Sequence, residues 1–149
     1  MAIRSHLFLL VTAVLVSSGW TAPRLHAQEG SAARADAKIT GNPEHGRYIA
    51  EHVAMCVECH SGRDESGSIL ESQKYLGAPL PLPGPPPAGW AIRVPRNRGL
   101  PGYTDDQAMR LLTDGAIGRE GNQLKLPMPR FRMTRQDAAD VIAFLRSLR

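Results

Sequence analysis

The stretch "CVECH", Cys56-Val57-Glu58-Cys59-His60, contains the only two cysteines of the 149-residue chain. Two residues separate the cysteines, and the histidine directly follows the second one. Two thiols and an imidazole this close together indicate a site with its own chemistry, because a structural cysteine pair needs no histidine beside it. The arrangement of the rest of the chain is therefore expected to follow from what this stretch holds.

Four interpretations of Cys-x-x-Cys-His compete: a structural disulfide, a thioredoxin-like redox pair, half of a zinc site, and covalent attachment of a c-type haem. A disulfide across two residues would constrain little of the unfolded chain and would leave His60 unexplained. A redox pair is expected at a helix N-terminus after a strand, whereas here the cysteines are predicted to follow a helix. Structural zinc commonly needs four ligands, and the other histidines offer no second pair at ligand spacing. The haem interpretation is favoured, with the disulfide as its main competitor.

A haem would also explain the spacing of the motif and the composition around it. Cys56 and Cys59 lie about one helical turn apart, so their sulfurs can bond to the two former vinyl groups on one porphyrin edge. His60 would then lie beneath the ring plane as an axial ligand to iron. The chain predicts only three short helices and few aromatic residues, which make a thin core that an apolar macrocycle would complete.

Upstream of the motif, the sequence predicts a helix that begins after Asn42 and runs directly into residues 56–60. Asn42 is a favourable N-cap and Pro43 suits the first helical position. Gly46 and Ala50 recur at helical spacing, and their small side chains would let a second helix approach closely. The expected partner is the last helix of the chain.

That last helix is predicted over "TRQDAADVIAFLRSLR". Thr134 serves as its N-cap, with Asp137 three residues later in a variant of the capping box. Phe144 or Leu145 would cover the contact with the first helix. The helix presents one apolar stripe, made of Ala138, Val141, Ile142, Leu145 and Leu148.

A shorter helix is predicted between these two, with Thr104 and Gln107 as a capping box and Gly115 as its stop. It follows a proline-dense segment, residues 76–100, that can form neither a helix nor a central strand. Because this segment contains Trp90 and ends at a helix, it is expected to wrap over something large and apolar.

The segment before the last helix, "KLPMPRFRM", is expected to supply a second axial ligand. Met128 lies between Pro127 and Pro129, whose fixed φ angles stiffen an extended chain. Met133 is the alternative. A methionine thioether favours ferrous iron and would raise the reduction potential relative to harder ligands.

The N-terminus has the pattern of a secretory signal peptide, residues 1–27, with an apolar run over residues 7–16 and cleavage after Ala27. Ten apolar residues are too few to span a membrane as a helix, although an uncleaved leader would act as a weak tether. Residues 28–41 are expected to form a flexible tail and residues 42–149 a single domain. The expected location is therefore the periplasm.

Loss of the leader would remove two of the 18 basic residues and no acidic one, which lowers the net charge from +4 to about +2. No run of basic residues interleaved with aromatic ones suggests nucleic acid as a partner. Arg93, Arg96 and Arg98 precede the short helix, and a second group consists of Arg130, Arg132 and Arg135. At the edge of a haem these arginines would steer an acidic redox partner.

The sequence resembles the class I cytochrome c family through "MCVECHS" near the start of the domain and "LPMPRFRMTRQDAADVIAFLRSL" at its end. The resemblance covers residues 42–148. It implies a small all-α fold, in which N- and C-terminal helices pack together around one covalently attached haem c, here with a long proline-rich loop. It also implies His60 and Met128 as the axial ligands.

The resemblance further implies a non-enzymatic protein that carries single electrons between a dehydrogenase and a downstream acceptor. The alternative is a haem subunit, sensor or enzyme module with an open iron site. A backbone carbonyl of the proline region is expected to orient the His60 ring. Trp90 and Tyr103 are expected to line the pocket or to bond a haem propionate, with simple packing as their alternative role.

Overall fold

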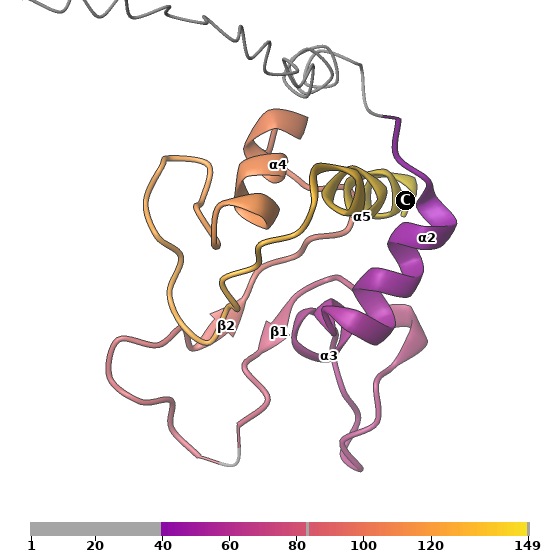
Figure 1. Cartoon of the computed structure of the whole chain (residues 1–149). Helices are drawn as coiled ribbons and strands as arrows, with labels where there is room; N and C mark the ends of the chain where they lie inside the picture. Colours follow the sequence, from indigo (N-terminus) through magenta and orange to yellow (C-terminus); the bar gives the residue numbers. More distant parts are fainter. Residues whose placement is uncertain (1–39, 83, 149) are drawn as a thin grey trace, which may run out of the picture. The chain divides into compact units, whose positions relative to one another are not determined.

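The computed structural model describes residues 40–82 and 84–148. The predicted signal peptide and residues 28–39 of the predicted tail lie outside the described residues. In the part of the chain that is described, no helix is both long and apolar enough to cross a membrane. The elements, in chain order, are α2 (Pro43–Tyr48), η1 (Ile49–Val53), α3 (Cys56–His60), η2 (Glu71–Gln73), β1 (Ala78–Pro79), β2 (Arg93–Val94), α4 (Asp105–Thr113) and α5 (Arg135–Ser147) (Figure 1).

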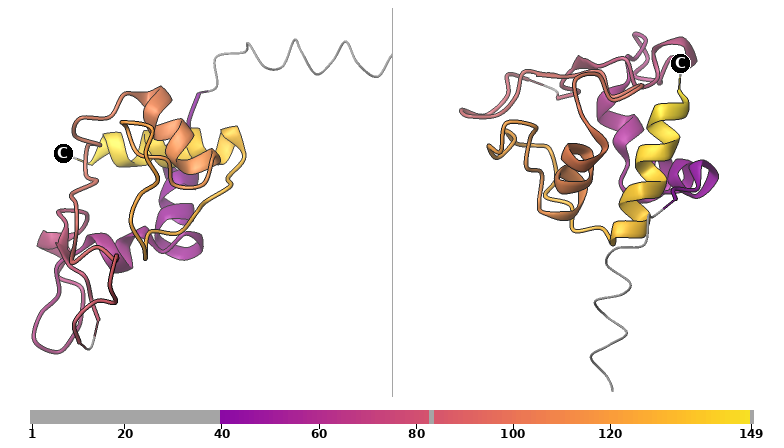
Figure 2. Two further views of the ribbon diagram at one scale, coloured as in Figure 1. Left: turned by 90° about the vertical axis from the view of Figure 1, so that its left-hand side faces the viewer. Right: turned by 90° about the horizontal axis from the view of Figure 1, so that it is seen from above.

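The contact between the N-terminal helix α2 and the C-terminal helix α5 organises the domain (Figure 2). Gly46 lies against the α5 backbone at Asp140 and Val141, so closely that a Cβ atom would overlap it. Ala50 and Phe144 are fully buried nearby. The structure therefore confirms the predicted packing of the two terminal helices and the role of small residues in it.

The buried carboxylate of Asp140 stabilises the contact between α2 and α5. Asp140 is 3% exposed and accepts hydrogen bonds from the backbone N–H of Asn42 at 2.7 Å and from Gln136 Nε2 at 2.8 Å. Its other oxygen lies 2.7 Å from Nδ1 of His45. Thr40 and Gly41 also pack on α5, through the Gln136 side chain and the backbone at Ala139 respectively.

The predicted continuous helix from Asn42 into the cysteine motif is wrong. After α2 the backbone widens into the π-helical turn η1. The Ala54 N–H closes this turn by donating to the Ile49 carbonyl at 2.7 Å. Met55 then adopts a left-handed conformation with φ of 53°, and α3 begins anew at Cys56. The break redirects the chain, so the motif forms a separate short helix with its own orientation.

The other two helices begin where their caps predict. Thr104 accepts the Gln107 N–H at 3.2 Å while the Gln107 side chain accepts the Thr104 N–H at 2.9 Å. Thr134 accepts the Asp137 N–H at 3.1 Å. α4 ends at Thr113, and Gly115 follows with a φ of 88°. Both capping predictions are confirmed.

The proline-dense segment is irregular, as predicted, and a small antiparallel ladder stabilises it. β1 pairs with β2 so that Ala78 faces Val94 and Pro79 faces Arg93. At the end of the segment, the Tyr75 carbonyl accepts both the Asn97 and the Arg98 N–H at 3.1 Å. The fold is that of a small, mostly helical domain in which this segment contacts α3 at His60, through Gly77 and Pro95.

Candidate functional site

The described residues enclose a cavity of about 440 Å³ with almost entirely apolar walls. The walls come from residues of α3, α4 and α5 and from parts of three further segments, residues 54–55, 91–103 and 124–131. A close-packed domain this small normally contains only voids near the size of a water molecule, whereas ligand and cofactor sites measure about 300–1,000 Å³. The cavity therefore has the size and polarity of a site for a large apolar group.

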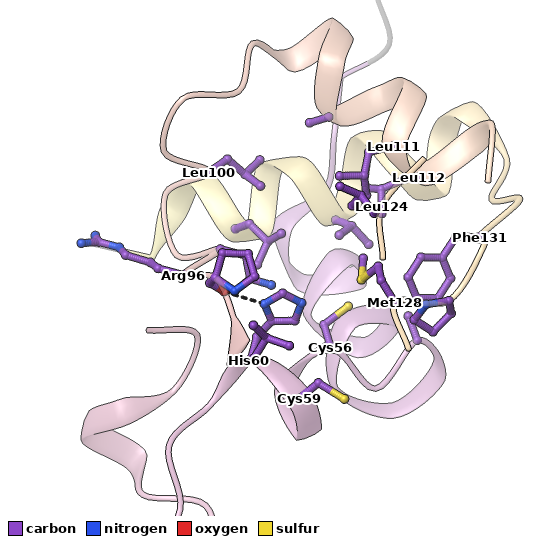
Figure 3. Close-up of a pocket in the computed structure, with 18 of the residues that line it drawn as sticks. Cys56, Cys59, His60, Arg96, Leu100, Leu111, Leu112, Leu124, Met128 and Phe131 are labelled. Carbon is purple, nitrogen blue, oxygen red and sulfur yellow. Dashed lines mark hydrogen bonds between the residues drawn. The ribbon is translucent and has the colours of Figure 1, made fainter. Parts of the chain in front are cut away.

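The short helix α3 places Cys56, Cys59 and His60 in one wall of this cavity (Figure 3). Both cysteines are free thiols in the structure. Burial raises the pKa of Cys56 to about 11 and also raises the pKa of Cys59, where the Glu58 carboxylate adds to the effect and Arg63 opposes it. A redox-active pair needs a lowered thiol pKa, so the structure argues against that interpretation although Cys56 begins a helix.

His60 is 7% exposed, and a hydrogen bond holds its ring in one orientation. Its Nδ1 lies 2.7 Å from the carbonyl oxygen of Pro95, which leaves Nε2 as the nitrogen able to bind a metal. Burial lowers the His60 pKa, and the bond to Pro95 only partly opposes this, so the ring is held in the neutral form that ligates metals. Pro95 belongs to the proline-dense segment, and the predicted carbonyl contact is confirmed.

Met128 lines the same cavity, together with the prolines on both sides of it. The close-up shows its sulfur facing the space that the His60 ring also faces (Figure 3). The alternative ligand, Met133, is outside the cavity wall; it packs on the hydrophobic core, and its N–H donates to the Leu112 carbonyl at 3.0 Å. The geometry thus favours Met128 over Met133.

The two predicted aromatic residues have different places. Tyr103 is half-buried in the cavity wall. Trp90 is half-buried in the proline-dense segment but does not line the cavity, and its backbone N–H donates to the Pro87 carbonyl at 3.0 Å. The neighbouring Ala91 takes a place in the wall instead.

The arginines divide into three groups. Arg93 and Arg96 reach the cavity, as does Lys125, which sequence reasoning missed. Arg98 lies in a separate cleft. The arginines that follow Met128 are exposed and lie outside the cavity wall: Arg130, Arg132 and Arg135. Pro95 and Lys125 have no recognisable signal of their own in the sequence, since both reach the site through long-range packing.

These residues fit a covalently attached haem. Two thiols lie in one wall, a neutral imidazole and a thioether face the same space, and the remaining surface is apolar. Nitrogen and thioether sulfur are the axial donors of low-spin haem iron.

Comparison with known proteins agrees with this donor set. The family model described as "Cytochrome c" matches residues 44–149. No curated protein matches the chain, and no solved structure does.

Proposed function

Because the chain belongs to the cytochrome c family, we propose that it is a periplasmic single-haem carrier that passes single electrons from a dehydrogenase to a downstream acceptor. Haem binding and electron transfer are the properties of the family as a whole. The main support for the proposal is that His60 and Met128 line one apolar cavity together with the cysteine pair. If His60 and Met128 both bind the iron, no position would remain open for oxygen chemistry.

The chain's own residues would perform four tasks. Cys56 and Cys59 would each add across a vinyl group, the sulfur bonding one carbon and the thiol proton going to the other. His60, oriented by Pro95, would offer Nε2 to the iron, and Met128 its sulfur. The bound haem supplies a reversible one-electron change at iron. The apolar walls would exclude water from it, so that little around the site has to reorganise when an electron moves.

Charges at the cavity support an acidic partner. Arg93, Arg96 and Lys125 reach the cavity, and Glu58 is the one carboxylate among the residues that line it. Glu58 already pairs with Arg63. The remaining positive charge would receive the haem carboxylates and would attract an acidic protein surface in brief, salt-sensitive encounters.

The same pairing of Glu58 bears on the alternative, a haem enzyme or sensor with an open iron site. A catalytic site needs a positioned acid or base, and Glu58 is engaged with Arg63 rather than aimed at a substrate. The periplasmic location rests on the leader pattern of residues 1–27.

Exposure of the ferrous, haem-loaded protein to carbon monoxide distinguishes an electron carrier from a protein with an open iron site. A carrier with Met128 on iron is expected to leave its ferrous absorption spectrum unchanged at neutral pH. Rapid conversion to a carbon monoxide complex would contradict the carrier function and favour the open-site alternative. Acid-treated protein, whose methionine ligand is released, provides the positive control.

A further inference from the structure

Three side chains that can ligate a metal meet where the N-terminal helix packs on the C-terminal one. His45 lies on α2, and Asp137 and Asp140 lie three positions apart on α5. One donor atom from each residue, an imidazole nitrogen or a carboxylate oxygen, lies within 4.8 Å of the other two. None of the three residues lines the haem cavity. The cluster is therefore separate from the site around the cysteine motif.

Each carboxylate of the cluster has one oxygen engaged by hydrogen bonds and a second oxygen that is less engaged. Oδ1 of Asp140 accepts a backbone N–H at 2.7 Å and an amide side chain at 2.8 Å, whereas its Oδ2 lies 2.7 Å from Nδ1 of His45. Oδ2 of Asp137 accepts the Thr134 hydroxyl at 2.8 Å, and its Oδ1 has no hydrogen-bond partner among the described residues. Hydrogen bonds of this kind orient the carboxylates that ligate metals.

The cluster is negatively charged and open to solvent on one side. Within residues 40–82 and 84–148, neither carboxylate forms an ion pair with a lysine or an arginine. Asp140 is 3% exposed, and its partner His45 is charged only when protonated. A buried charge is normally paired or bound to a metal, so the cluster suits a cation. The His45 side chain is 48% exposed and Asp137 is half-buried, which leaves a path from solvent to the cluster.

We infer that His45, Asp137 and Asp140 bind one zinc ion between α2 and α5. Zinc accepts imidazole and carboxylate ligands at about 2.0–2.2 Å, whereas magnesium and calcium prefer sites made of oxygen alone. The ion would take the place of the hydrogen between Nδ1 and Oδ2, and the 2.7 Å between these atoms would widen to about 3.3 Å. The neutral ring would then carry its proton on Nε2, and water would complete the four-coordinate shell.

Calorimetric titration of the haem-loaded, oxidised protein with zinc chloride tests this site, with magnesium chloride as the comparison ion. The haem must be in place, because the free thiols of the cysteine pair would themselves bind zinc. The variants are His45→Gln and Asp137→Asn; Asp140 is left unchanged because it also holds α2 on α5. The matched controls are His52→Gln and Asp106→Asn, since both residues are exposed and outside the cluster. Each variant's haem absorption spectrum is recorded first, so that failure of haem binding is seen separately from failure of this site.

Saturable binding of one zinc ion per chain is expected, and magnesium should neither bind nor displace it. Loss of one ligand should weaken zinc binding about tenfold or more in His45→Gln and in Asp137→Asn, while both controls bind zinc as the unchanged protein does. The site is refuted if zinc does not saturate at one ion per chain, or if magnesium binds equally tightly. Controls that lose as much affinity as the cluster variants would also refute it.

Denaturant unfolding gives a second readout, because an ion that binds only the folded chain stabilises it. At a zinc concentration that saturates only the unchanged protein, zinc should raise the midpoint of unfolding of that protein but not of His45→Gln. A midpoint that zinc leaves unchanged in both proteins would contradict a site that joins the two terminal helices.

Discussion

His60 and Met128 contribute different atoms to the site, and both atoms are determined by their immediate surroundings. The Pro95 carbonyl engages Nδ1 of His60 at 2.7 Å, so only Nε2 remains for a metal. Met128 lies between two prolines that also line the cavity. Both side chains are thus oriented toward the same cavity by their neighbours, as expected for a pair of metal ligands.

The Met128→Ala variant is expected to lose the far-red absorption band that a thioether gives ferric haem, and to gain a high-spin spectrum. The reason lies in the positions of the other methionines near the site: Met133 packs on the core, outside the cavity wall, and Met55 lines the cavity but is the N-cap of α3, the helix that carries His60. Met133→Ala is the matched control and should keep the band. A Met128→Ala protein with an unchanged low-spin spectrum would show that Met128 is not the ligand.

Asp140 gives a residue-scale prediction about stability. Burial raises its pKa, but the Asn42 N–H, His45 and Gln136 outweigh burial and hold the pKa below its usual 3.8. These bonds therefore stabilise the fold fully above about pH 3.8, and their contribution is lost as the pH falls through the lower, folded-state pKa. Asp140→Asn should lower the free energy of unfolding by roughly 1.5–3 kcal/mol at neutral pH.

Denaturant unfolding followed by circular dichroism measures this effect at several pH values. The difference in free energy of unfolding between the unchanged protein and Asp140→Asn should shrink as the pH falls below 3.8. Glu65→Gln is the control, because Glu65 is exposed. A difference that stays constant down to acid pH would contradict the role given to the Asp140 charge.

Among the elements, the contact of α2 with α5 depends on the absence of a side chain at Gly46. A Cβ atom there would overlap the Asp140 carbonyl, and that backbone cannot retreat without moving α5. Gly46→Ala should therefore lower the free energy of unfolding by about 1–3 kcal/mol or more. In Gly84→Ala the added methyl group meets nothing within 4 Å, so its effect should stay within about 0.5 kcal/mol. Equal stability of the two variants, measured by denaturant unfolding, would refute the close approach.

Arg146 joins α5 to the segment that leads into α4. Its guanidinium donates to the carbonyls of Gly99 at 2.7 Å and Tyr103 at 2.6 Å and to the Asp105 carboxylate at 3.0 Å. Arg146→Ala should speed amide hydrogen exchange over residues 99–103 about tenfold. Arg135→Ala, at the exposed start of α5, is the control. Unchanged exchange in this segment would mean that the bonds do not hold it.

The helix starts could be predicted from the sequence because their causes are local. A threonine and a residue three positions later determine each cap, at Thr104 and at Thr134. The break before the motif could not be predicted in this way. Met55 adopts a positive φ although neither glycine nor asparagine marks the position, and the preceding π-helical turn has no side-chain cap hydrogen bond that a sequence pattern could reveal.

The site residues divide in the same way, into those that a local sequence pattern predicts and those whose position depends on how distant segments fold. The motif predicted Cys56, Cys59 and His60 as site residues and the paired prolines predicted Met128, and the structure places all four at one cavity. Pro95 could be assigned only to a region, because the carbonyl that meets His60 depends on how residues 76–100 fold back through the β1–β2 ladder. The same fold-back places Ala91 in the cavity wall while the neighbouring Trp90 stays outside it.

For the molecule as a whole, α3, α4, α5 and an irregular segment surround an apolar cavity that adjoins the hydrophobic core. Ala108, Leu112, Val141 and Leu145 belong both to the hydrophobic core and to the cavity wall. A domain built in this way needs an apolar group to complete its packing, and the cysteine pair determines where that group is attached. Folding and haem binding are therefore expected to be coupled in this protein.

A redox titration of the haem-loaded protein, followed by absorption spectroscopy, tests the central claim most directly. The account predicts one covalently held haem per chain, a low-spin spectrum in both oxidation states, and a single reversible one-electron transition. A haem that can be extracted by acidified solvent, a high-spin ferric spectrum, or the absence of a reversible one-electron step would contradict it.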